Sequence, residues 1–149
     1  MASWSDVERD APELATVVLA RFTTRKHHTL ATLRRDGSPR ISGTEIEFSD
    51  GNLWIGSMPA AVKARDLQRD PRFALHSATV DPPADDPSGW PGEAKVAGRA
   101  IEVSDPGATG EPHRFRLDVA EVVFTRVEGN ELVIDSWSAD RGFVRRRRT

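Results

Sequence analysis

Apolar and polar residues alternate along much of this chain, and a period of two residues is typical of β-strands with one buried face. The alternation is clearest over Ala94–Val103 and is broken near Ala120–Glu121, where a β-bulge would fit. Turn residues such as Asp36-Gly37 separate the strands, and tight turns between successive strands favour an antiparallel barrel over a parallel sheet. The strands predicted in this way cover Thr29–Leu33, 39–48, Asn52–Ser57, Phe73–Val80, Ala94–Val103, Phe115–Val127 and Glu131–Trp137.

The first 25 residues have a helical pattern, since Leu14, Val18 and Phe22 recur at the spacing of one helix face. The run Ser5-Asp6-Val7-Glu8 has the form of a capping box and predicts a helix that begins at Ser5. Pro12 either kinks this helix or restarts it. We expect residues 1–25 to form an N-terminal helix that packs on the barrel.

The stretch from Gly51 to His76 predicts a strand, a turn, a short helix and another strand. Pro59 suits the first position of a helix, and Pro71 would end that helix. A helix N-terminus after a strand offers free N–H groups, so Ser57 and Lys63 there make a candidate phosphate site. The spacing alone leaves open that Lys63 is simply a solvated helix lysine.

Length and charge narrow the possible functions. A chain of 149 residues is expected to form a single domain, residues 1–149, and its formal net charge of −2 argues against a nucleic-acid binder. The chain has no cysteine, which excludes disulfides and thiol catalysis, and its four histidines lack the spacing of a zinc site. No signal peptide and no membrane-spanning run is found, so we expect a soluble, cytoplasmic protein without a membrane partner.

Three segments lie outside the predicted strands. Trp90, in a loop rich in Pro, Asp and Gly, covers either a cofactor pocket or apolar surface of the barrel or of a second subunit. Ser104–Pro112 is a turn-rich connection. The last residues, 138–149, end in four arginines and are expected to form an exposed basic tail.

The runs LATLRRDGSPRISGTEIEF, DGNLWIGSM and KARDLQRDPRFALH together resemble the pyridoxamine 5′-phosphate oxidase-like superfamily, which includes the flavin/deazaflavin oxidoreductases. The resemblance implies a mainly β, α+β fold: a six- to seven-stranded antiparallel Greek-key split β-barrel, with an N-terminal helix and a short helix between its third and fourth strands. It also implies a homodimer that binds two cofactors between its subunits. The implied cofactor is FMN, with a deazaflavin coenzyme of the F-420 type as the alternative.

The same resemblance assigns roles to individual residues. Lys63 would contact the cofactor phosphate, and the strand that carries Arg40, Ile41 and Ser42 would line the isoalloxazine ring and help to hold the phosphate tail. Ser57 and Met58 would lie at the edge of the flavin, although core packing is an equal alternative for Met58. The C-terminal pattern W-x-x-x-R-x-x-x-R would lie near the partner's flavin pocket, or else belong to a frayed tail; it comprises Trp137, Arg141 and Arg145.

Two classes of function follow. The first is an FMN- or deazaflavin-dependent oxidoreductase that transfers hydride between the cofactor and an unidentified small molecule, with no catalytic side chain assigned. The cofactor would then supply the chemistry and the protein would supply binding and orientation. The second is a non-catalytic module, either a flavin-binding protein or a barrel that binds a polyanion through its arginine tail.

Overall fold

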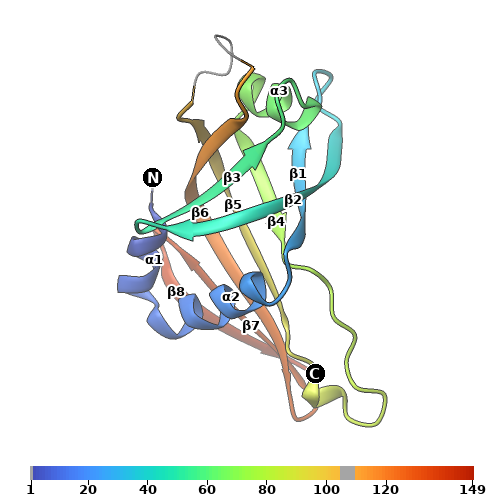
Figure 1. The fold of residues 1–149 in the computed structure, drawn as a ribbon. Helices are drawn as coiled ribbons and strands as arrows, with labels where there is room; N and C mark the ends of the chain where they lie inside the picture. The colour runs from blue at the N-terminus through green and yellow to red at the C-terminus, as the bar shows by residue number, and fades with distance from the viewer. Residues whose placement is uncertain (1, 105–109) are drawn as a thin grey trace.

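The computed structural model describes residues 2–104 and 110–149, and most of the predicted Ser104–Pro112 connection lies outside these residues. Its strands form one antiparallel sheet in the order β3-β2-β1-β4-β5-β6-β7-β8 (Figure 1). An additional pairing between β3 and β6 closes the first six strands into a barrel, which confirms the predicted split β-barrel. The strands are β1 (His27–Leu33), β2 (Pro39–Ser49), β3 (Asn52–Ser57), β4 (Arg72–His76), β5 (Glu93–Glu102), β6 (His113–Glu128), β7 (Glu131–Ser138) and β8 (Gly142–Arg148).

The longest strand, β6, joins the barrel to the extension formed by β7 and β8. Its pairing with β5 shifts register between Ala97 and Gly98, which leaves Ala120 as the extra residue of a β-bulge, as predicted. A side chain at Gly98 would collide with the carbonyl oxygen of Asp118 across this bulge. The bulge therefore requires glycine at position 98.

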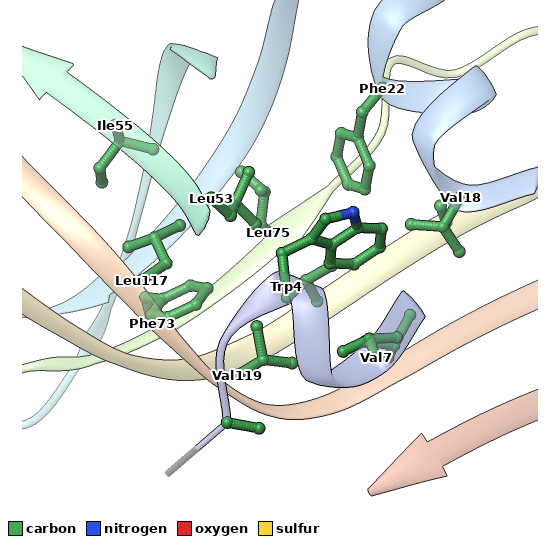
Figure 2. Close-up of a cluster of buried hydrophobic side chains, with 14 of the residues drawn as sticks. Trp4, Val7, Val18, Phe22, Leu53, Ile55, Phe73, Leu75, Leu117 and Val119 are labelled. Carbon is green, nitrogen blue, oxygen red and sulfur yellow. The ribbon is translucent and has the colours of Figure 1, made fainter. Parts of the chain in front are cut away.

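The N-terminal region forms two helices, α1 (Trp4–Asp10) and α2 (Pro12–Thr24), because Pro12 starts a new helix. The observed capping box begins at Ser3, so the prediction of a start at Ser5 was wrong by two positions. Trp4 and Phe22 reach from these helices into the same cluster of buried side chains as Leu53 and Val119 of the barrel (Figure 2). The two helices thus complete the hydrophobic core.

Other predictions about where elements begin and end were also wrong. The short helix α3 (Val62–Arg69) begins three residues after Pro59, because Ala60 has a φ of 59° and cannot belong to a right-handed helix. The basic segment after β7 is not a frayed tail, since Gly142 turns the chain back and β8 pairs along the length of β7. Most side chains of β8 are nevertheless exposed, as expected.

The other connections are short or irregular. Trp90 follows the 3₁₀ turn η1 (Pro87–Gly89), and its indole N–H donates a hydrogen bond to the Val80 carbonyl at 2.7 Å. This bond links the two ends of the loop that contains Trp90. The preceding strand β4 ends at His76, four residues earlier than predicted. Within the described part of the chain, no helix is long and apolar enough to cross a bilayer.

Candidate functional site

A cavity of about 880 Å³ opens beside Lys63, between β2, β3, the turn that precedes α3 and the first residues of β6. We call it the Lys63 cavity. Ser57, Met58 and Lys63 all reach it, so the structure brings together three of the residues predicted from the sequence. The residues that line it are His27, Gly43, Thr44, Glu45, Ile46, Glu47, Trp54, Ile55, Gly56, Ser57, Met58, Pro59, Lys63, Ser104, Glu111, Pro112, His113 and Arg114.

Lys63 is positioned by the short helix α3, whose buried residues Ala64 and Leu67 anchor it to the barrel. Its ammonium donates a hydrogen bond of 2.9 Å to the Gly43 carbonyl of β2. Burial of the half-buried side chain lowers the pKa of Lys63, and the nearby Glu45 carboxylate partly opposes this shift. An ammonium has three donors, so two hydrogens remain after the bond to Gly43.

Two glycines leave backbone exposed to the cavity. A side chain at Gly43 would meet no protein atom within 4 Å, and one at Gly56 would meet only the His113 carbonyl oxygen at 3.7 Å. A planar ring could therefore approach these strands closely.

Two acidic residues of the cavity, Glu45 and Glu47, have cationic partners. Glu45 lies 3.5 Å from the Lys26 ammonium and 3.4 Å from the His27 ring, and Glu47 lies 3.8 Å from the Arg114 guanidinium. Arg114 also stacks over the Trp54 ring, 4.1 Å from its centroid. The ammonium beside Gly43 and the open backbone of β2 and β3 fit a planar cofactor that carries a phosphate.

His113 contributes to the site in a way that the sequence did not reveal. Its buried ring accepts a hydrogen bond from the Ala60 N–H at Nε2, at 3.1 Å, and its Nδ1 lies 3.3 Å from a carboxylate oxygen of Glu102. Glu102 therefore favours the tautomer with hydrogen on Nδ1, and this tautomer holds the strained turn at Ala60. The sequence pattern assigned no role to this histidine, because its two partners come from distant segments.

Three predicted residues of β2 do not line the Lys63 cavity. Arg40 donates from Nε to Asp66 at 2.7 Å and does not line the Lys63 cavity. Ile41 is 75% exposed on the outer face of the barrel, away from this cavity. Ser42 is half-buried between them and is also not among the residues that line the cavity.

The two predicted C-terminal residues do not reach the cavity either. Trp137 is 1% exposed in the core, and its indole N–H has no hydrogen-bond partner within the described part of the chain. Arg145 binds the buried Asp135 carboxylate at 2.7 Å and 3.1 Å, in a separate cavity beneath the junction of α1 and α2. The strand pairing of β7 and β8 accounts for both positions. The role expected for these residues near the partner's flavin pocket stays a prediction.

The closed six-stranded barrel with a cavity at Lys63 defines the class of this protein as a split β-barrel. The family model for pyridoxamine 5′-phosphate oxidase matches residues 15–129. The chain therefore belongs to the pyridoxamine 5′-phosphate oxidase family, as its sequence motifs indicated. A search of curated proteins finds no match.

Solved structures with the same fold include proteins with different ligands. A pyridoxamine 5′-phosphate oxidase-related, FMN binding protein from Nostoc punctiforme PCC 73102 is 12% identical, with a TM-score of 0.66 over 93% of this chain and 96% of that one. PhzG from Burkholderia lata 383, in complex with tetrahydrophenazine-1-carboxylic acid, is 13% identical, with a TM-score of 0.64 over 93% of this chain and 89% of that one. A heme binding protein from Mycobacterium smegmatis is 20% identical, with a TM-score of 0.60 over 83% of this chain and 58% of that one.

Proposed function

We propose that this protein binds FMN in the Lys63 cavity and acts as an oxidoreductase on a small molecule. The observation that carries the proposal is the half-buried Lys63 ammonium, which the fold holds 2.9 Å from a backbone carbonyl at the edge of a cavity large enough for a cofactor. A phosphate is a stronger acceptor than a neutral carbonyl, because charge-assisted hydrogen bonds are shorter and stronger. Its family membership and the FMN-binding structural neighbour support the same cofactor.

The remaining residues of the cavity would hold and orient the cofactor. The backbone of β2 and β3 at Gly43 and Gly56 offers a surface without side chains for a planar ring. Met58 is 78% exposed at the edge of the cavity, where an adaptable thioether side chain can cover a bound ring. FMN would supply the redox chemistry when bound, and a deazaflavin coenzyme remains the alternative cofactor.

A titration compares the candidate cofactors directly. FMN, riboflavin, a deazaflavin coenzyme and haem are each added to the purified protein, and binding is followed by fluorescence or absorbance. We expect one FMN per subunit with micromolar or tighter affinity, and weaker binding of riboflavin because it lacks the phosphate. Equal affinities for FMN and riboflavin would remove the phosphate contact from the proposal, and a preference for haem would refute it.

We also propose that the protein is a homodimer, with the outer face of β1, β2, β4, β5 and β6 as the contact surface. This face has a shallow hollow of about 360 Å³. Most of its lining side chains are apolar, among them Ala31, Ile41, Ala74 and Ala97, and the others include His76, Lys95 and Glu121. Exposed apolar surface of this kind marks an interaction site, and the commonest oligomer is a C₂ dimer in which the same face meets itself.

Light scattering tests the dimer. We expect twice the single-chain mass of 16.4 kDa at micromolar concentration. Ile41→Glu should reduce the mass to that of one chain, because it introduces a charge at the centre of the proposed contact. Val103→Glu is the matched control, since Val103 is also an exposed apolar residue, at 47%, and lies outside the hollow. A single-chain mass for the unaltered protein would contradict the dimer.

A further inference from the structure

A second charged site lies beside α3, where five arginines surround one cleft of about 450 Å³. We call it the arginine cleft. It is formed by the turn between β1 and β2, the start of β2 and one side of α3, which lie together at one end of the barrel (Figure 1). Lys63 is not among its lining residues, so the cleft is distinct from the Lys63 cavity. The residues that line it are Arg34, Arg35, Asp36, Arg40, Val62, Arg65, Asp66 and Arg69.

The base of the arginine cleft is built around Asp66, a carboxylate that is only 1% exposed. It accepts hydrogen bonds from Arg40 Nε at 2.7 Å, from Arg69 Nη2 at 2.7 Å and from the Thr32 hydroxyl at 2.8 Å. Burial raises the pKa of Asp66, but hydrogen bonds from Arg40, Thr32 and Arg69 outweigh it, so the net pKa is lowered. The ionised Asp66 therefore fixes two guanidiniums at the edge of the cleft.

The other acidic residue of the cleft is also satisfied. Asp36 accepts from the Ser38 N–H at 3.0 Å and from the Ser38 hydroxyl at 2.6 Å, and these bonds lower its pKa. The guanidiniums of Arg35 and Arg65 make no ion pair or hydrogen bond with the described residues. Arg40 uses only Nε toward Asp66, so its terminal nitrogens are free to bind a ligand.

The charge of the cleft indicates what it would bind. Five arginines and two aspartates leave a net charge of +3, although the whole chain has a net charge of −2. One phosphate group carries about −1.5 to −2 at pH 7, which is less than this excess. Two linked phosphates match the charge better, and the planar guanidinium fork is suited to bidentate contacts with phosphate oxygens.

We propose that the arginine cleft binds a pyrophosphate group, either free or as the diphosphate of a nucleotide. Asp66 acts as a positioning residue, since it orients Arg40 and Arg69 and does not contact the ligand. Arg35 and Arg65 supply charge that has no other partner among the described residues. The site is independent of the FMN proposal, because the two sets of lining residues do not overlap.

Isothermal titration calorimetry with inorganic pyrophosphate tests the proposal. The double variant Arg35→Gln/Arg65→Gln should bind pyrophosphate at least about tenfold more weakly, because each arginine–phosphate contact is a charge-assisted hydrogen bond. The double variant Arg146→Gln/Arg148→Gln is the control. It removes the same charge from exposed residues of β8 and should leave the affinity unchanged.

Titration with ADP and with a single-stranded RNA identifies the source of the pyrophosphate group. Tighter binding of ADP than of pyrophosphate would assign the group to a nucleotide, and equal or weaker binding would assign it to the free anion. Absence of pyrophosphate binding, or an equal loss in both double variants, would overturn the proposal. It would also be overturned if the RNA bound the cleft in preference to pyrophosphate.

Discussion

Replacing Lys63 with alanine is the sharpest test of the phosphate contact. The ammonium is half-buried and already oriented by its bond to the Gly43 carbonyl, so a phosphate there would meet a donor that loses little freedom on binding. A hydrogen bond to a charged group is worth about 1.5–3 kcal/mol, and about 1.4 kcal/mol is a tenfold change in affinity. Lys63→Ala should therefore weaken FMN roughly tenfold to a hundredfold.

Riboflavin provides the internal control, since it has the same ring and no phosphate. Its affinity should change by less than about threefold in Lys63→Ala, whereas the affinity for FMN falls, and fluorescence titration measures both. Arg65→Ala is the matched control on the same helix, because Arg65 does not line the Lys63 cavity. Lys63→Arg should recover only part of the FMN affinity, because the longer planar fork needs a different geometry.

The fold should survive this substitution, since alanine is a better helix former than lysine and Lys63 is not a core residue. Unchanged unfolding by urea would show that any loss of FMN affinity is local. If Lys63→Ala bound FMN normally and Arg40→Ala or Arg65→Ala abolished binding, the reasoning about the phosphate ligand would be refuted.

Two further predictions concern stability and are measured by urea unfolding. Gly98→Ala should lower the free energy of unfolding by about 2–3 kcal/mol, because its methyl group meets backbone at the β-bulge, whereas Gly43→Ala should be neutral or slightly stabilising. Asp66→Asn should lower the free energy of unfolding by about 2 kcal/mol at pH 7. This is less than the cost of breaking a fully buried ion pair, because the arginine partners of Asp66 are partly exposed. The pKa of Asp66 is lowered in the fold, so its contribution to the free energy of unfolding is present above the usual aspartate pKa and is lost as the pH falls below about 4. The difference in free energy of unfolding between the unaltered protein and Asp66→Asn should therefore shrink at about pH 3.

The sequence predicted those features that depend on local patterns. A short apolar run located β3 at its observed bounds, Asn52–Ser57, and the break in the alternation of the later strand located the bulge at Ala120. Resemblance of the motifs to a known family supplied the barrel and Lys63, although spacing alone left a solvated lysine as an alternative. Each of these features depends on residues that lie close together in the sequence, so a local pattern is enough to predict it.

The features that the sequence missed depend on contacts between distant residues. Asp66 lies on a short helix, and its hydrogen bonds with Arg40 and Thr32, 26 and 34 residues away, make it a buried anchor. His113 holds the turn at Ala60, 53 residues away, and no local pattern signals that contact. The arginine-rich strand β8 lacks the apolar alternation by which strands are recognised, and pairing with β7 alone defines it.

A crystal structure of the protein grown with FMN would test the central claim most directly. We predict the isoalloxazine ring in the Lys63 cavity, against β2 and β3, and a phosphate oxygen about 2.7–2.9 Å from the Lys63 ammonium. Density for the FMN phosphate in the arginine cleft, or for the ring away from the Lys63 cavity, would contradict the account.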